Sequence, residues 1–195
     1  MPAELNNPTP LDFFGLTADQ FDTLAAGWKW PRFRAGQIRD WVYQKGVQDF
    51  AAMSNLAKRD REELPQRLRL VQSTIISHQS SEDGTQKLLL AWADNANAET
   101  VMIPDGPRRT ACISSQVGCP VGCHFCASGV NGVKGNLSAH QIVEQVIRLN
   151  QLLKPAEERI TNVVFMGMGE PLANYANVMQ AVHVLHDPAG LNISA

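Results

Sequence analysis

The chain has 195 residues, of which 44% are hydrophobic, and its 17 basic and 19 acidic side chains leave a formal net charge of −2. This length can bury a core in one or two domains, and no apolar run approaches a membrane span, so we expect no membrane partner. The slightly acidic balance argues against nucleic-acid binding by bulk charge, but a local basic patch can still bind RNA. Four cysteines and no charged-then-apolar leader indicate a reducing, cytoplasmic location.

The first part of the chain is predicted to be a small helical domain over residues 1–68, behind a loose leader over residues 1–10. Prolines, glycines and capping residues mark where its helices begin and end. The predicted helices run over Ala18–Ala26 between Thr17 as cap and Gly27, over Arg34–Gln44, and from Asp49 or Ser54 toward Arg67 with an interruption at Pro65.

Basic and aromatic side chains alternate between Trp28 and Lys45, with five basic residues against one acidic residue. Basic groups contact phosphates and aromatic rings stack on exposed bases, which is typical of RNA recognition. Ile38 and Trp41 nevertheless share one helical face and are expected to be buried in the core. The basic side chains expected to face outward are Lys29, Arg32, Arg34 and Arg39.

Strand character begins after residue 68. Leu70–Gln79 and Gln86–Trp92 flank the turn residues Glu82–Thr85, which predicts a β-hairpin and makes residues 69–108 a β-hairpin extension. Ala98–Ile103 and Arg109–Ser115 continue as strands.

The remainder, residues 109–195, alternates strands and helices. This alternation predicts an α/β fold with parallel βα units, whose active sites lie at the carboxyl ends of the strands. After Arg109–Ser115 we predict a helix from its cap Ser138 to Leu152, a buried parallel strand over Ile160–Met166, a helix over Asn174–His186, and the start of another element at Leu191–Ala195.

Three cysteines, Cys119, Cys123 and Cys126, stand in a C-x3-C-x2-C pattern just after the strand over Arg109–Ser115. Three thiolates on one loop can hold three corners of an iron–sulfur cubane and leave the fourth iron open to a substrate. Structural zinc is the main alternative, but it usually takes four ligands in paired knuckles, and His124 lies inside the single C-x2-C pair. Cys112 is a candidate fourth ligand seven residues upstream.

The cysteine loop resembles the signature of the radical S-adenosylmethionine (SAM) superfamily. With the blocks Ala98–Pro104, Arg109–Cys119 and Phe165–Leu172, the chain is similar from about Phe13 onward to the RNA adenine-C2 methyltransferases of that superfamily. The resemblance implies that residues 109–195 are the first part of a (β/α)6 radical SAM barrel. It also implies a [4Fe–4S] cluster on the three cysteines and SAM as the second cofactor.

The resemblance assigns roles to individual residues as well. Gly169 and Glu170 would receive the amino group of SAM, and Phe125 would lie near its adenine. Glu99 would accept a proton near the target base, and Cys112 would help to resolve an enzyme–RNA adduct. The sequence does not decide which of these two residues removes the proton, so both are candidates. Without the resemblance, Glu99 is an ordinary solvent-facing residue at a strand start and Cys112 a small buried hydrophobe.

The implied function is methylation of C2 of a specific adenine in large-subunit ribosomal RNA and in tRNA, through a 5′-deoxyadenosyl radical. The electron would come from a donor such as flavodoxin or ferredoxin. Members of this family carry the methyl group on a cysteine near the C-terminus, and no cysteine follows Cys126. We therefore expect an N-terminal fragment that holds a cluster but does not methylate RNA alone. A related adenine-C8 methyltransferase and a non-catalytic zinc and RNA-binding module are the alternatives.

Overall fold

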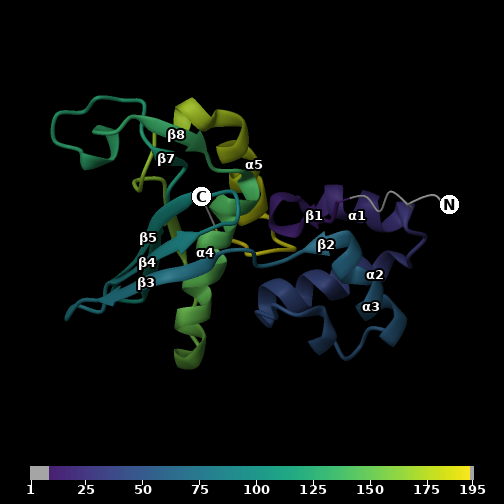
Figure 1. Ribbon diagram of the computed structural model, residues 1–195. Helices are drawn as coiled ribbons and strands as arrows, with labels where there is room; N and C mark the ends of the chain where they lie inside the picture. Colours follow the sequence, from purple (N-terminus) through teal and green to yellow (C-terminus); the bar gives the residue numbers. More distant parts are fainter. Residues whose placement is uncertain (1–8, 194–195) are drawn as a thin grey trace.

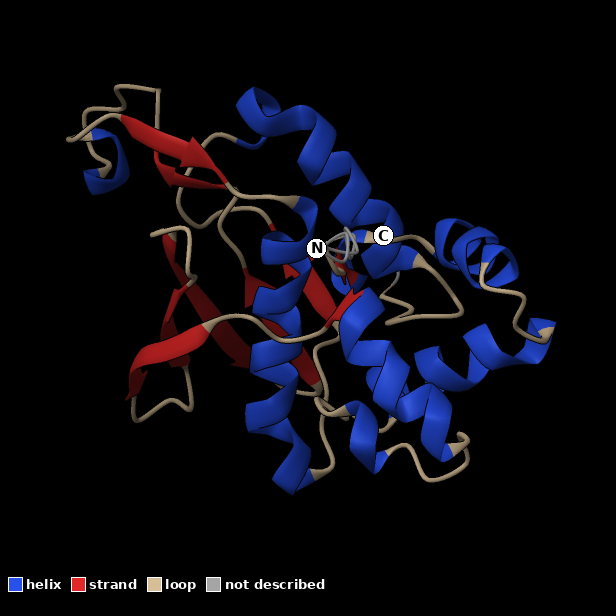
Figure 2. Cartoon of the chain, turned by 45° about the vertical axis from the view of Figure 1, so that its right-hand side comes forward, coloured by secondary structure: helices blue, strands red, loops and turns tan. Residues whose placement is uncertain are grey.

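The computed structural model describes residues 9–193, so most of the predicted leader lies outside the described residues. Helices gather beside a mixed sheet, as Figure 1 shows, and one long helix crosses a face of that sheet in Figure 2. The helices are α1 (Ala18–Gly27), α2 (Arg32–Arg39), α3 (Lys58–Arg67), α4 (Ala139–Leu153) and α5 (Tyr175–His186). The strands are β1 (Leu11–Asp12), β2 (Leu68–Arg69), β3 (Thr74–Ser80), β4 (Gln86–Ala91), β5 (Asn97–Asp105), β6 (Arg108–Cys112), β7 (Gln116–Gly118), β8 (Val133–Asn136) and β9 (Asn162–Val164).

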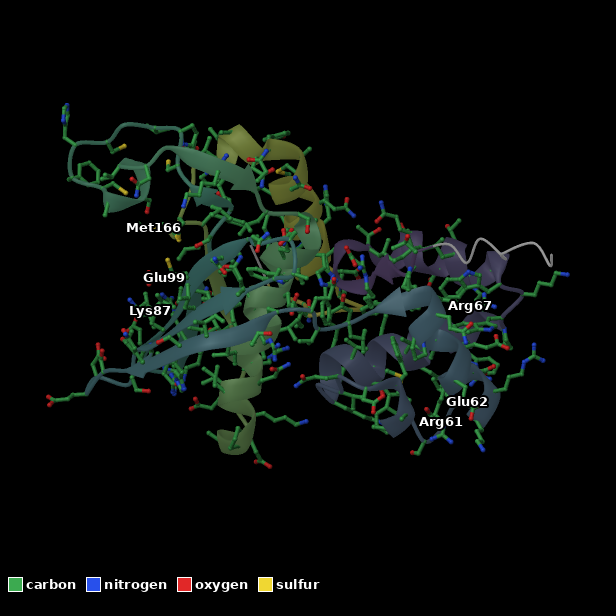
Figure 3. The ribbon with its side chains drawn as sticks, in the orientation of Figure 1. Arg61, Glu62, Arg67, Lys87, Glu99 and Met166 are labelled. Carbon is green, nitrogen blue, oxygen red and sulfur yellow. The ribbon has the colours of Figure 1, made fainter. Side chains whose placement is uncertain are left out.

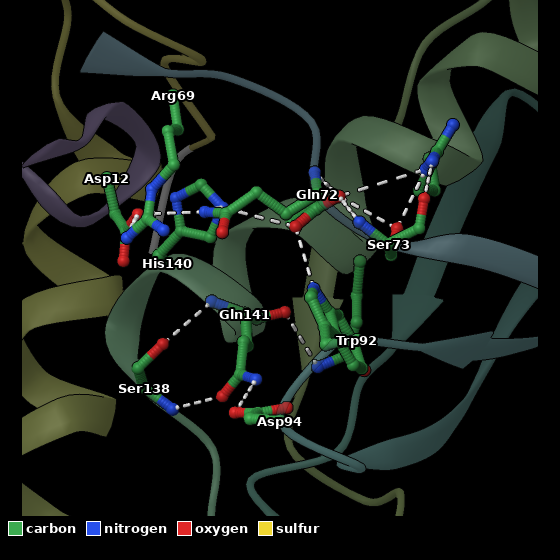
Figure 4. Close-up of polar contacts among 12 residues, drawn as sticks. Asp12, Arg69, Gln72, Ser73, Trp92, Asp94, Ser138, His140 and Gln141 are labelled. Atoms are coloured by element: carbon green, nitrogen blue, oxygen red, sulfur yellow. Dashed lines mark hydrogen bonds and ion pairs between the residues drawn. The ribbon is translucent and has the colours of Figure 1, made fainter. Parts of the chain in front are cut away.

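Two predicted helix starts are confirmed with their caps. The Thr17 hydroxyl accepts the Gln20 N–H at 3.3 Å, and the Gln20 side chain accepts the Thr17 N–H at 2.9 Å, which closes a capping box at α1. Ser138 and Gln141 form the same arrangement at the start of α4 (Figure 4). These bonds satisfy amides that the first turn of a helix leaves unpaired.

The helical region departs from prediction at three points. The helix predicted over Arg34–Gln44 begins earlier, at Arg32, and its last part, Asp40–Gln44, is a π-helix. The predicted interruption at Pro65 is wrong, because α3 runs through it to Arg67 and the missing N–H falls in the last turn, where it removes a single bond. Ser54 does not open a helix; Asp49 instead caps the short 3-10 helix η3 (Phe50–Ala52) by accepting the Ala51 N–H.

The large sheet has the order β3-β4-β5-β6-β9, antiparallel up to β6 and parallel between β6 and β9. The predicted hairpin is confirmed, with Gly84 at a positive φ of 84° in the turn. Its first strand begins at Thr74 rather than Leu70, because the backbone amides of Gln72 and Ser73 donate to the Glu144 carboxylate of α4 instead of a strand.

The parallel βα arrangement is confirmed, but both of its strands are shorter than predicted. β6 stops at Cys112 because the main chain of Ser114 is bonded by the Gln145 side chain. β9 covers only Asn162–Val164 and is half-buried rather than buried, since it is the edge strand of the described sheet. Residues 191–193 form no strand, and residues 194–195 lie outside the described range.

The two faces of the sheet differ. One face is buried, and α4 packs against β5 on it; its buried side chains are Leu88, Leu90, Ala98, Thr100, Met102 and Ala111. Because successive side chains of a strand alternate between its two faces, the opposite face of the sheet carries Lys87, Glu99, Val101 and Cys112, which are only half-buried.

Buried side chains form one continuous core from Phe13 to Ile193, so the predicted domain boundaries at residues 68 and 108 stay a prediction. No helix within residues 9–193 is long and apolar enough to cross a membrane.

Candidate cluster and cofactor site

Two connecting segments meet where β6 and β9 end. The Ile113 N–H donates to the Val164 carbonyl at 3.0 Å, and the Gly167 N–H returns a bond to the Ile113 carbonyl at 3.1 Å. A further bond of 2.8 Å joins the Ser115 N–H to the Met168 carbonyl. Main-chain bonds therefore hold the segment that leads into the cysteine loop against the turn that contains Gly169 and Glu170.

This turn requires its glycines. A Cβ at Gly167 would lie 2.7 Å from the Ile113 carbonyl oxygen, and one at Gly169 would lie 2.6 Å from the Gln116 Cβ. Gly169 also has φ of +99°, a conformation that other residues rarely adopt. The half-buried Glu170 is held at both ends, since its N–H donates to the Gln116 side chain at 2.9 Å and its carboxylate accepts the Leu172 N–H at 3.0 Å.

Gly169→Ala is expected to lower the free energy of unfolding by about 2 kcal/mol, because the added methyl group meets the main chain at a positive φ. Gly36→Ala is the control, since nothing lies within 4 Å of its added Cβ inside α2. That change should stabilise the protein by up to about 1 kcal/mol through helix propensity. Urea unfolding of both variants measures the difference, and equal effects would contradict the close approach at Gly169.

The cysteine loop projects from a small antiparallel ribbon made by β7 and β8 (Figure 1). Its base is closed by a 3.2 Å bond from the Cys119 N–H to the Gly132 carbonyl. Gly118 has φ of +76°, and a Cβ there would collide with that same carbonyl. The ribbon therefore carries the loop beyond the end of the sheet, on the side of the glycine turn.

The donor set of the loop fits an iron–sulfur cluster. All four cysteines are free thiols; Cys123 is exposed, while Cys119 and Cys126 are half-buried. Hydrogen bonds from Ser128, and a weaker one from the Gly129 backbone, hold the pKa of the Cys126 thiol below its usual value, which favours the thiolate that metals bind. Within residues 9–193 no three His, Cys, Asp or Glu side chains lie close enough together to hold a metal ion. The role of the three cysteines as cluster ligands therefore stays a prediction.

Glu99 and Cys112 lie on the same open face of the sheet. Cys112 is paired with Val101, two residues along β5 from Glu99. The Glu99 carboxylate forms a 3.1 Å ion pair with Lys87 of β4, and Figure 3 shows both side chains below Met166. Burial raises the pKa of the Cys112 thiol, against a smaller opposite effect of a hydrogen bond with the Met166 backbone, so the neutral thiol is favoured. Their predicted catalytic roles remain predictions.

The basic stretch before Lys45 is less available than predicted. Lys29 and Arg32 are exposed, but the expectation that Arg34 and Arg39 face outward is wrong. Arg34 pairs with Asp60 of α3 at 3.1 Å, Arg39 pairs with Asp22 of α1, and both guanidinium side chains are largely covered. The acidic partners lie on neighbouring helices, which the pattern of a single segment does not reveal.

The two predicted core residues of this stretch differ from each other. Ile38 is buried, as predicted, whereas Trp41 is only half-buried. The Lys45 ammonium lies 3.6 Å from the centre of the Trp41 ring, and the indole N–H donates to Asn55. The Trp41 ring therefore lies at the surface of the helical region, where its face contacts the Lys45 ammonium and its N–H is hydrogen-bonded.

A cavity of about 400 Å³ lies away from this site, between the chain around Lys45 and the C-terminal end of α4. The strands β6 and β9 end instead near the N-terminus of α4, where the Leu137 N–H donates to the Ser115 carbonyl. We place the functional site at the strand ends, because parallel βα units carry their chemistry there and because the segment that leads into the cysteine loop meets the glycine turn there.

Comparison with known proteins identifies the family. Residues 11–70 match the model of the ribosomal RNA large subunit methyltransferase N-terminal domain, and residues 113–194 match that of the radical SAM superfamily. The chain belongs to the RlmN family of radical SAM proteins. Membership implies a [4Fe–4S] cluster and SAM as cofactors, and the thiols and glycine turn described above are suited to hold them.

Individual relatives agree with this family. A probable dual-specificity RNA methyltransferase RlmN of Symbiobacterium thermophilum is 45% identical over 92% of this chain and 48% of its own length. The corresponding protein of Rhodopirellula baltica is 46% identical over 83% of this chain and 43% of its own. A crystal structure of a radical SAM methyltransferase from Sphaerobacter thermophilus superposes with a TM-score of 0.88 at 39% identity, over 96% of this chain and 55% of that one. The chain thus spans about half the length of these relatives.

Sequence reasoning did not single out Gln116. Its side chain accepts the Glu170 N–H and donates to Asn136 of β8 at 2.7 Å, so it connects the glycine turn to the base of the cysteine loop. No charge, spacing or periodicity distinguishes this glutamine in a single sequence, and its role is visible only once the two strand ends are placed together.

Proposed function

We propose that this chain serves in a radical SAM methyltransferase that methylates C2 of a specific adenine in large-subunit ribosomal RNA and in tRNA. The observation that carries the proposal is that main-chain bonds at the ends of β6 and β9 join the Gly167–Glu170 turn to the segment that leads into the cysteine loop. The names of relatives, which describe dual-specificity RNA methyltransferases, support the substrate class. The cytoplasm is the proposed location, and a flavodoxin or ferredoxin the proposed electron donor.

Each residue of the site has a separate proposed role. Cys119, Cys123 and Cys126 would hold the cluster, which when bound supplies the electron for cleaving SAM to a radical. Gly169 leaves room at the main chain, and the Glu170 carboxylate would accept hydrogen bonds from the amino group of the cofactor. The Gln116 side chain of the segment that enters the cysteine loop holds the Glu170 N–H, and Gly169 lies close against the same residue.

The target adenine would lie over the open face of the sheet. Glu99 presents a carboxylate there, held at 3.1 Å from the Lys87 ammonium, and would accept the proton that leaves C2 of the base. Cys112, one strand away on that face, would supply the thiol that helps to resolve an enzyme–RNA adduct. The exposed Lys29 and Arg32 of the helical region offer positive charge for RNA phosphates.

Anaerobic reconstitution of the chain with iron and sulfide tests the cofactor assignment. We expect a brown protein whose colour bleaches on reduction and whose spectrum changes when SAM is added. A colourless protein with stoichiometric zinc would instead support a zinc and RNA-binding module and overturn the proposal.

Deleting the gene from its host tests the target atom. Mass spectrometry of digested ribosomal RNA and tRNA should show the loss of 2-methyladenine from both, and restoring the gene should restore it. Persistence of 2-methyladenine, or loss of 8-methyladenine in its place, would overturn the C2 assignment while leaving the cofactor assignment standing.

A further inference from the structure

The hydroxyl group of Ser114 lies where three parts of the site meet. Ser114 is fully buried; its Oγ donates to the Glu99 carbonyl of β5 at 2.6 Å and accepts the Met168 N–H at 2.9 Å. Ser114 itself belongs to the segment between β6 and the cysteine loop. One side chain thus joins the strand of the candidate proton acceptor, the entry to the cluster loop and the glycine turn.

The main chain of Ser114 is fixed independently by α4. The Gln145 side chain accepts the Ser114 N–H at 2.8 Å and donates to the Ser114 carbonyl at 2.9 Å, and Gln145 is fully buried. A single amide therefore satisfies both backbone groups of a residue that has left the strand ladder. Because α4 packs against the sheet, Ser114 is held to a rigid helix rather than to a loop.

The Gly167–Glu170 turn packs directly against the Ser114 hydroxyl. A Cβ added to Gly167 would lie 2.7 Å from the Ser114 Oγ, so turn and hydroxyl are already in contact. Displacement of the turn would leave the Met168 N–H without its partner, and a buried donor without a partner is costly. The position of Glu170, two residues on, follows from that of Met168.

We propose that Ser114 is a positioning residue, which sets the affinity for SAM by fixing the Gly167–Glu170 turn against the strand that carries Glu99. The inference rests on the proposed function, because it takes this turn as the place where the amino group of SAM binds. Ser114 acts through the turn and does not itself touch the cofactor.

Ser114→Ala tests the proposal in the reconstituted, reduced chain. SAM is titrated while its effect on the electron paramagnetic resonance spectrum of the cluster is followed. We expect about tenfold weaker binding of SAM, the effect of losing roughly one hydrogen bond that orders the turn. The iron content should stay unchanged, because the three cysteines are intact.

Thr100→Val is the matched control. Thr100 is also fully buried, and its hydroxyl donates to the Cys112 carbonyl at 3.1 Å, yet it makes no bond to the glycine turn. Both variants should unfold at a lower temperature, but Thr100→Val should keep the wild-type affinity for SAM. Unchanged affinity in Ser114→Ala, or an equal loss in Thr100→Val, would overturn the inference.

Two further outcomes are decisive. If Ser114→Ala does not fold, Gly167→Ala pushes the turn away from the same hydroxyl, and unchanged SAM affinity in that variant would overturn the inference. If SAM has no effect on the spectrum of the wild-type chain, the proposed function fails and this inference fails with it. A wild-type response that Ser114→Ala retains contradicts only the role of Ser114.

Discussion

Replacing Glu144 with glutamine is expected to lower the free energy of unfolding by about 3 kcal/mol at neutral pH. The Glu144 side chain is fully buried, and its oxygens accept the backbone N–H groups of Gln72 and Ser73 at 2.8 and 2.7 Å and the Trp92 indole N–H at 2.8 Å. An amide offers one acceptor oxygen in place of two, so at least one of these buried donors would lose its partner.

The effect of this substitution should depend on pH. Burial alone would raise the pKa of Glu144, but hydrogen bonds from His140, the Ser73 backbone and Trp92 outweigh it and lower the pKa to about 2. A carboxyl group whose pKa is lower in the folded state contributes stability that is complete above its unfolded pKa of about 4.3 and is lost as pH falls toward 2. The difference between wild type and variant should therefore shrink from about pH 4.5 downward.

Urea unfolding of both proteins at several pH values measures this convergence. Glu62→Gln is the matched control, because Glu62 is an exposed acid that pairs with Lys58 of the same helix at 3.8 Å. Its cost should stay within about 0.5 kcal/mol. A Glu144→Gln effect that is as small, or that does not change with pH, would show that the buried carboxylate does not hold the hairpin and α4 together.

Features set by neighbouring residues could be predicted from the sequence. The caps at Thr17 and Ser138 and the hairpin turn at Gly84 follow from side chains a few positions away, and all three occur in the structure. The ends of β3 and β6 could not be predicted. They depend on Glu144 and Gln145 of α4, which remove main-chain groups from the strand ladders and lie more than thirty positions away in the chain.

In the candidate site, too, some features could be predicted from the sequence and others depend on contacts between distant segments. The expectation that the cysteine loop and the Gly169 turn share one end of the sheet rests on a general property of parallel strands, and the structure bonds the turn to the segment that leads into the loop. That Glu99 and Cys112 share a face depends on the register of β5 against β6, which a single sequence does not specify. The pairing of Arg34 and Arg39 with acids on other helices depends on packing in the same way.

Cys123→Ser is expected to abolish cluster binding, reducing the iron and sulfide of the reconstituted chain from about four of each to background. Cys123 is an exposed thiol on a projecting loop, so its loss should leave the unfolding temperature unchanged. Two thiolates cannot hold three corners of a cubane, and the spectral response to SAM should disappear together with the iron. Iron and sulfide analysis, followed by visible absorption with and without SAM, measures both effects.

Cys112→Ser distinguishes an open cluster from a fully ligated one. Cys112 ends β6 and is paired with Val101 and Val164 within the sheet, whereas the cysteine loop extends beyond β7 and β8. We therefore expect this variant to keep its full iron content and its response to SAM. Loss of iron in Cys112→Ser would make Cys112 a fourth ligand; no iron would then remain open to a cofactor, and the SAM chemistry proposed for the Gly169 turn would have no metal on which to act.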